Sequence, residues 1–140
     1  MTRIARTFLS LMALLGVAIL TVPGTALAAP TADPAYNTKT QHLTSEPTSD
    51  MPESCIERSI TLASGYYDWR IKGAAERPDL YLGAGRYTWK DCLIPGDGFY
   101  VQQSSLNPDN PDWDTILLTD YWFLAYSGSH QWGSSLLPHF

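Results

Sequence analysis

The chain has 140 residues, with fourteen Asp and Glu against nine Lys and Arg, and a formal net charge of −5. Proteins that bind nucleic acid through its phosphates need clustered Lys and Arg, and docking on anionic lipid needs the same cations. We therefore expect neither nucleic acid nor a membrane surface among the partners of this chain.

Residues 1–28 have the pattern of a cleavable secretory signal. Two arginines within the first six residues precede an apolar run over residues 8–22, and Ala26-Leu27-Ala28 provides a small-x-small cleavage site. The apolar run is short for a membrane span of about 20 residues. We expect a secreted protein. Cleavage removes two of the nine basic residues and none of the fourteen acidic ones, which leaves a net charge of −7.

Residues 29–54 differ in composition from the rest of the chain. They are rich in Pro, Thr, Ser and Asp, and Tyr36 is their only aromatic residue. Such a segment has too little apolar surface to offset the entropy lost on ordering. We predict a disordered spacer over residues 29–54, followed by a single folded domain over residues 55–140.

Residues 55–140 favour an all-β fold. Short runs of Ile, Leu, Tyr, Trp and Thr alternate with Gly, Asn, Asp and Pro, and no apolar pattern of helical period is present. This spacing is typical of a small antiparallel β-sandwich or barrel. Cys55 and Cys92 are the only cysteines. In an exported chain such a pair is expected to form a disulfide.

A weak repeat occurs three times, in residues 60–69, 80–89 and 122–132. Each copy reads apolar-x-Leu, then a small turn ending in Gly, then x-aromatic-x-Trp, with His130 in the aromatic position of the third copy. A strand, a glycine turn and a returning strand form a hairpin. The sequence therefore predicts three hairpin repeats.

Alternation along these strands assigns each side chain to one of two faces. The inward set is Ile60, Leu62, Tyr67, Trp69, Leu80, Leu82, Tyr87, Trp89, Trp122, Leu124, His130 and Trp132. The outward aromatic residues are then Tyr66, Tyr81, Tyr121 and Phe123, with Trp113 in a loop. We interpret Trp113, Tyr66, Tyr81 and Tyr121 as candidate ligand-binding residues.

The loop over residues 107–114 carries alternating oxygen ligands. Asn110, Asp112 and Asp114 have the spacing with which an EF-hand-type calcium loop begins. Thr115 stands where that loop needs Gly, and the bidentate Glu is missing. The alternative is a proline-rich turn closed by Asx hydrogen bonds, which we favour.

Little in the sequence points to catalysis. The chain has neither a Gly-x-Ser-x-Gly nor a His-Glu-x-x-His motif. We expect His130 to be buried and His139 to lie in a frayed C-terminus, and Asp68, Asp91 and Asp97 to be solvated. We therefore expect no enzyme activity and no cofactor.

Three functions fit these expectations. The first is a secreted, non-catalytic binding module for polysaccharide or the cell wall. The second is a secreted protease inhibitor or protein-interaction domain that presents the loops at 95–98 or 107–114. The third is a structural surface-coat protein. Polysaccharide and an extracellular protein are thus the expected partners.

Overall fold

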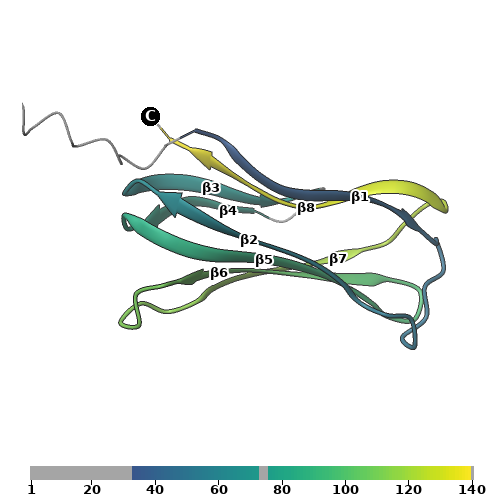
Figure 1. The fold of residues 1–140 in the computed structure, drawn as a ribbon. Helices are drawn as coiled ribbons and strands as arrows, with labels where there is room; N and C mark the ends of the chain where they lie inside the picture. Colours follow the sequence, from purple (N-terminus) through teal and green to yellow (C-terminus); the bar gives the residue numbers. More distant parts are fainter. Residues whose placement is uncertain (1–32, 73–75, 140) are drawn as a thin grey trace, which may run out of the picture.

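The structure, a computed structural model, describes residues 33–72 and 76–139, so the predicted signal over residues 1–28 lies outside it. The described ranges contain no helix, and so no helix that is long and apolar enough to cross a membrane. Eight strands are present (Figure 1): β1 Ala35–Leu43, β2 Ser54–Leu62, β3 Gly65–Ile71, β4 Glu76–Leu82, β5 Gly85–Pro95, β6 Tyr100–Pro108, β7 Ile116–Trp122 and β8 Gly128–Pro138.

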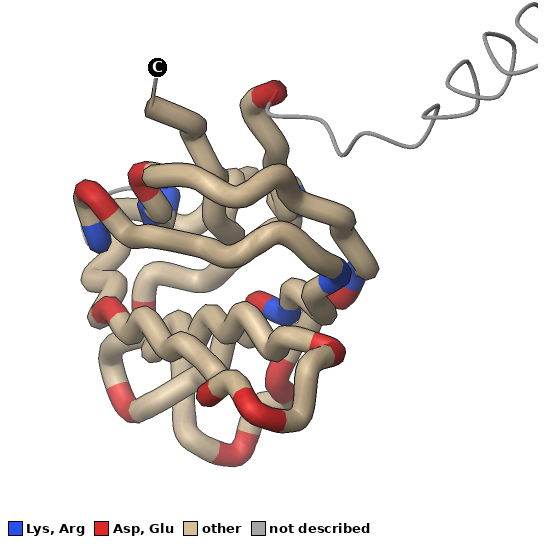
Figure 2. The backbone as a smooth tube through the Cα atoms, turned by 90° about the vertical axis from the view of Figure 1, so that its left-hand side faces the viewer, with Lys and Arg blue, Asp and Glu red and all other residues tan. Residues whose placement is uncertain are grey.

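The strands form two four-stranded sheets that pack face to face. Sheet A has the order β1-β8-β3-β4 and sheet B the order β2-β5-β6-β7, and every neighbouring pair is antiparallel. Figure 2 shows the two layers nearly end on. The predicted all-β sandwich is confirmed.

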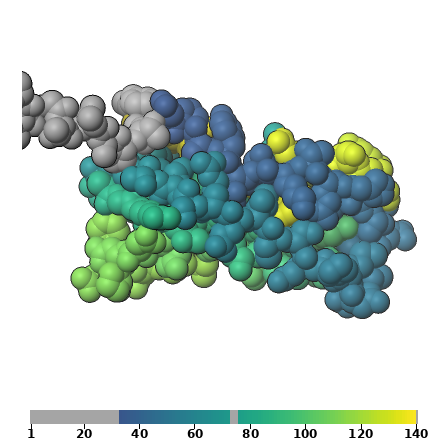
Figure 3. Space-filling model, viewed as in Figure 1, coloured from purple at the N-terminus to yellow at the C-terminus, as the bar shows by residue number. Residues whose placement is uncertain are grey.

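The N-terminal strand β1 corrects the predicted spacer. It pairs with β8 along its whole length, from Ala35 opposite Leu136 to Leu43 opposite Gly128, and it forms part of the continuous surface of the domain (Figure 3). Asn37 and Leu43 are buried. Disorder is thus wrong for residues 35–43, because pairing with β8 and a few inward side chains order a strand whose average composition is polar.

The three repeats are corners between sheets and not hairpins. Residues 63–64 lead from β2 in sheet B to β3 in sheet A, residues 83–84 lead from β4 back to β5, and residues 123–127 lead from β7 to β8. The hairpin prediction is wrong because a corner and a hairpin show the same alternation. At a corner, however, the inward faces of the two strands belong to opposite sheets.

Each of the first two corners contains the same type of tyrosine hydrogen bond. Tyr67 and Tyr87 each donate their hydroxyl to the carbonyl four residues earlier, that of Ala63 at 2.7 Å and that of Gly83 at 2.8 Å. Burial raises the pKa of both phenols, so they remain neutral donors at ordinary pH. The two phenols therefore anchor the strands that follow the corners to the turns that precede them.

The third corner has the same arrangement with histidine. The His130 Nε2 atom lies 3.0 Å from the Tyr126 carbonyl oxygen, and the two rings are 4.8 Å apart. His130 is half-buried, so it occupies the predicted position but is less enclosed than expected.

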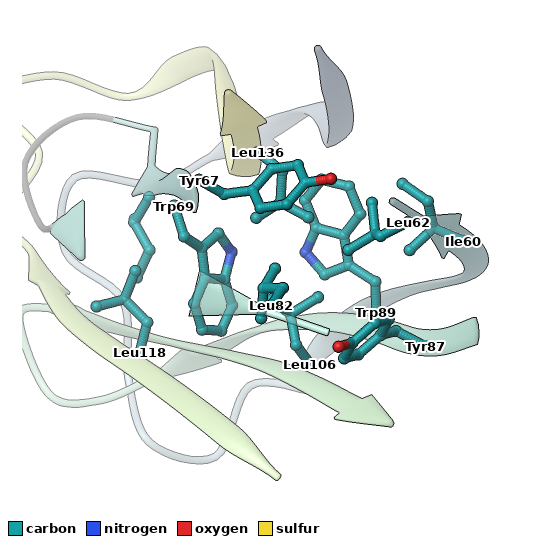
Figure 4. Close-up of a cluster of buried hydrophobic side chains, with 11 residues drawn as sticks. Ile60, Leu62, Tyr67, Trp69, Leu82, Tyr87, Trp89, Leu106, Leu118 and Leu136 are labelled. Atoms are coloured by element: carbon teal, nitrogen blue, oxygen red, sulfur yellow. The ribbon is translucent and has the colours of Figure 1, made fainter. Parts of the chain in front are cut away.

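The tryptophans at the ends of the repeats form the core, as predicted. Trp69, Trp89 and Trp132 are fully buried. Trp69 and Trp89 lie between the sheets with their indole nitrogens facing each other (Figure 4). Both nitrogens donate to the Ser134 hydroxyl, at 3.1 and 2.9 Å.

A buried carboxylate lies beneath this serine. Asp91 on β5 is 0% exposed and accepts hydrogen bonds from four side chains. These donors are Ser104, Ser134 at 2.8 Å, Asn37 at 2.6 Å and Gln102 at 3.2 Å. Desolvation raises the pKa of Asp91, and the four hydrogen bonds act against that rise. The expectation of a solvated Asp91 is wrong, because donors from four other strand positions replace water.

The disulfide between Cys55 and Cys92 is present, as predicted. The two residues are opposite each other in the β2–β5 ladder of sheet B. Their sequence separation is 37, and a loop of this length would stabilise the fold by about 4 kcal/mol through the unfolded chain.

We expect Asp91→Ala to lower the free energy of unfolding by about 3 kcal/mol, because it leaves several buried donors without an acceptor. Urea denaturation measures the difference. Asp112→Ala removes an exposed carboxylate and serves as the control, with an expected change within about 0.5 kcal/mol. Equal effects of the two substitutions would contradict the structural role of Asp91.

Candidate binding surface

Two of the four predicted aromatic residues lie side by side on the outer face of sheet A. Tyr66 on β3 is directly opposite Tyr81 on β4. Their rings meet edge to face with centroids 5.3 Å apart, and the residues are 54% and 58% exposed. The register between β3 and β4 creates this aromatic pair, which alternation alone could not reveal.

Trp113 lies near the same end of the sandwich. It lines a cleft of about 300 Å³ together with Tyr81 and Asp114. Its ring packs over Gly83 and lies 6.5 Å from the ring of Tyr87, so the residue is only 42% exposed. The cleft joins Trp113 to the aromatic pair, although one side of the indole is used for packing.

Tyr121 is not part of this surface. It lies on β7 of sheet B, where its ring and that of Phe123 are each 6.0 Å from the ring of Phe99. Tyr121 is 60% exposed and Phe123 more so. The predicted aromatic residues therefore divide into a group on sheet A and a separate Phe99–Tyr121–Phe123 cluster on sheet B.

The loop with the candidate calcium ligands forms an Asx turn. The Asn110 side-chain oxygen accepts the Asp112 amide at 3.0 Å, and the Trp113 amide donates to the Asn110 carbonyl at 3.2 Å. Asp114 lies at the cleft beside Trp113. Among the described residues, the aspartates of this loop do not belong to a group of three or more His, Cys, Asp or Glu residues with ligand atoms close to one another. This geometry supports the Asx-turn interpretation.

A carboxylate–histidine cluster lies beside the aromatic pair and was missed in the sequence. The His139 Nε2 atom is 2.7 Å from an Asp68 carboxylate oxygen, and its Nδ1 atom is 3.1 Å from one of Asp79. The His139 amide also donates to the Tyr66 carbonyl at 2.9 Å. The prediction of a frayed His139 is therefore wrong. No local sequence motif predicts the cluster, because its three members lie on, or directly after, three different strands.

The cluster has a strained backbone at one member. Asp79 has a φ of 53°, a conformation that residues other than glycine rarely adopt. The β3–β4 register shifts between Tyr67 and Trp69, and the Asp79 amide donates to the Asp68 carboxylate at 3.1 Å. The bulge thus turns the two carboxylates toward one imidazole.

The charges in this cluster stabilise one another. The hydrogen bond with Asp68 raises the pKa of His139, and the same bond lowers the pKa of Asp68. An imidazole that meets a carboxylate at each ring nitrogen is suited to donate from both, as an imidazolium. Asp68, Asp79 and His139 form the one group of three close potential metal ligands in the described residues. The spacing is that of an ion-paired triad, whose free oxygen lone pairs can accept hydrogen bonds from hydroxyl groups.

Comparison of the chain with protein-family models, with curated proteins and with solved structures finds no match.

We expect the His139 imidazole to titrate above its ordinary value of 6.5. The stability that this bridge contributes is fully present between pH 3.8 and 6.5, the ordinary values of the two groups. It is lost as the pH rises through the raised pKa of His139 and as it falls through the lowered pKa of Asp68. An NMR titration of the ring protons measures the first value.

Asp68→Asn should move the His139 titration back toward 6.5, whereas Asp112→Asn, which is remote from the cluster, should leave it unchanged. An identical titration of His139 in the wild type and in Asp68→Asn would show that the bridge does not form in solution.

We expect Gly83→Ala to displace Trp113, because the added methyl group would lie well inside van der Waals contact of the indole ring. The emission of Trp69, Trp89 and Trp132 should change little, since these three residues remain enclosed. The contribution of Trp113 to fluorescence quenching is the difference between a protein and its Trp113→Phe form, and it is compared between the wild type and Gly83→Ala. Unchanged quenching would mean that Trp113 does not rest on Gly83.

Proposed function

We propose that the protein is an extracellular, non-catalytic binding module that holds polysaccharide on the outer face of sheet A. The observation that carries the proposal is the exposed Tyr66–Tyr81 pair next to the cluster of Asp68, Asp79 and His139. Aromatic faces pack against the apolar faces of sugar rings, and carboxylates accept the hydrogen bonds of sugar hydroxyls. Both kinds of group are here on one surface.

The rigidity of this surface favours binding. Its side chains project from paired strands whose opposite faces pack on the buried core of Tyr67, Trp69 and Leu82. A site on such strands loses little conformational entropy when a ligand binds. The predicted export signal supports an extracellular location, and a disulfide in a small all-β domain is compatible with one.

The Phe99–Tyr121–Phe123 cluster favours a second candidate, a protein-interaction domain that uses sheet B. The cluster combines exposed Tyr121 on the edge strand β7 and exposed Phe123 just after it with half-buried Phe99 in the turn between β5 and β6. Clustered exposed aromatics are typical of protein interfaces. Polysaccharide binding on sheet A and protein interaction on sheet B can therefore be tested separately.

The test is retention on a panel of insoluble and soluble polysaccharides, with Tyr66→Ala, Tyr81→Ala and the double variant. Each single substitution should weaken binding by about tenfold, which corresponds to about 1.4 kcal/mol for the lost ring contact. Tyr121→Ala is the matched control, because it removes an equally exposed tyrosine from the other sheet. Circular dichroism verifies that the variants are folded.

Two results would overturn the proposal. One is retention on no member of the panel. The other is a loss of binding in Tyr121→Ala but not in the sheet A variants, which would favour the second candidate.

A further inference from the structure

A groove runs along β8 on the outer face of sheet A. It has a volume of about 390 Å³. One wall is formed by Tyr36 and Thr38 of β1, and the other by Arg70 and Lys72 at the end of β3. Gln131 and Leu137 line it from β8 itself. The six steps from Gln131 to Leu137, at about 3.3 Å each, give this stretch of β8 a length of about 20 Å.

The groove exists because the central strand carries small residues where its neighbours carry large ones. Ser135 is opposite Tyr36 on one side and opposite Arg70 on the other. In the next row, Gly133 is opposite Thr38, and its carbonyl accepts the Lys72 amide at 2.8 Å. Side chains therefore rise on β1 and β3 and are short or absent on β8 between them.

Glycine is required at the floor of this groove. Gly133 has a φ of 119°, and a Cβ there would collide with the backbone of Asn37 and Thr38. Gln102 reaches across the core to hold Gly133 from beneath, donating to its carbonyl at 2.9 Å and accepting from its amide at 3.3 Å. The open floor of the groove is thus built into the fold.

The walls of the groove differ in chemistry. Tyr36 is 57% exposed and offers an aromatic face. Opposite it, the Nε atom of Arg70 donates to Glu76 at 2.6 Å. A guanidinium has five N–H donors in a fixed fork, and this geometry suits the two oxygens of a carboxylate. Lys72 adds a second positive charge on the same wall.

We propose that the groove along β8 binds a carboxylated polysaccharide, with the sugar rings against Tyr36 and their carboxylates on Arg70 and Lys72. The inference rests on the proposed function, because it names the class of glycan that would lie on the same face. After the predicted cleavage the protein has a formal net charge of −7, and such an acidic protein repels polyanions in general. Recognition therefore depends on these two cations and on contacts with the sugar.

The groove leads to the candidate binding surface. Leu137 at its end is opposite Asp68, and His139 follows directly after the end of β8, where its amide donates to the Tyr66 carbonyl. A linear glycan along β8 would pass from the cationic wall to the carboxylate–histidine cluster and the aromatic pair. Its carboxylates would lie at Arg70 and Lys72, and its hydroxyls at Asp68.

The experiment uses the exported chain and three probes: polygalacturonate, which carries carboxylates; a neutral β-glucan; and poly(glycerol phosphate), which carries phosphodiesters. Polygalacturonate should bind best, and its binding should weaken with added salt because the cations are partly exposed. Arg70→Gln combined with Lys72→Gln should weaken polygalacturonate binding by about tenfold or more and leave β-glucan binding unchanged. The matched control is Arg86→Gln combined with Lys90→Gln, which removes the same charges from sheet B and should change neither.

The possible failures are distinct. If polygalacturonate binds no better than β-glucan, or if the Arg70 and Lys72 variant binds both as well as the wild type does, the inference is wrong and the proposed function stands. If poly(glycerol phosphate) alone binds, the carboxylate class is wrong. If no probe binds and the wider panel is also negative, the proposed function fails as well.

Discussion

The whole sandwich depends on a hydrogen-bonded carboxylate that is closed off from water. Asp91 on sheet B accepts from Ser134 on sheet A, and Ser134 in turn accepts from the indoles of Trp69 and Trp89. Two of the three repeat tryptophans thus meet at one hydroxyl. Hydrophobic burial is non-directional, whereas a buried carboxylate needs donors at particular positions and is heavily penalised when they are missing. The network therefore sets the position of the sheets relative to each other.

The same network shapes the outside of sheet A. Gln102 bonds to Asp91 and to both backbone groups of Gly133, so the residue that forms the floor of the β8 groove is held from within the core. On the outer side of the sheet, the groove runs along this same strand. Strand β8 thus contacts the buried polar groups on its inner face and forms the floor of the groove on its outer face.

Local pattern predicts part of this structure, and long-range pairing decides the rest. Alternation correctly placed Tyr67, Trp69 and Trp89 inward and Tyr66 outward, because the period of a strand is a local property. It could not distinguish a hairpin from a corner, since this depends on which sheet receives the next strand. The strand at residues 35–43 was missed because its order comes from pairing with β8. Asp91 and the cluster at His139 were missed because their partners are distant in sequence.

The position of the last strand has a consequence for how the domain can form. β8 lies between β1 and β3, so sheet A has no continuous ladder without the C-terminal residues. β5, β6 and β7 are consecutive hairpin partners and can pair as soon as they are available. In a chain that emerges N-terminus first, sheet A would therefore stay incomplete until β8 is available, because β1 pairs with residues that are 85 to 101 positions further along the sequence. Closure of sheet A is thus a late step of folding, whereas most of sheet B can assemble before it.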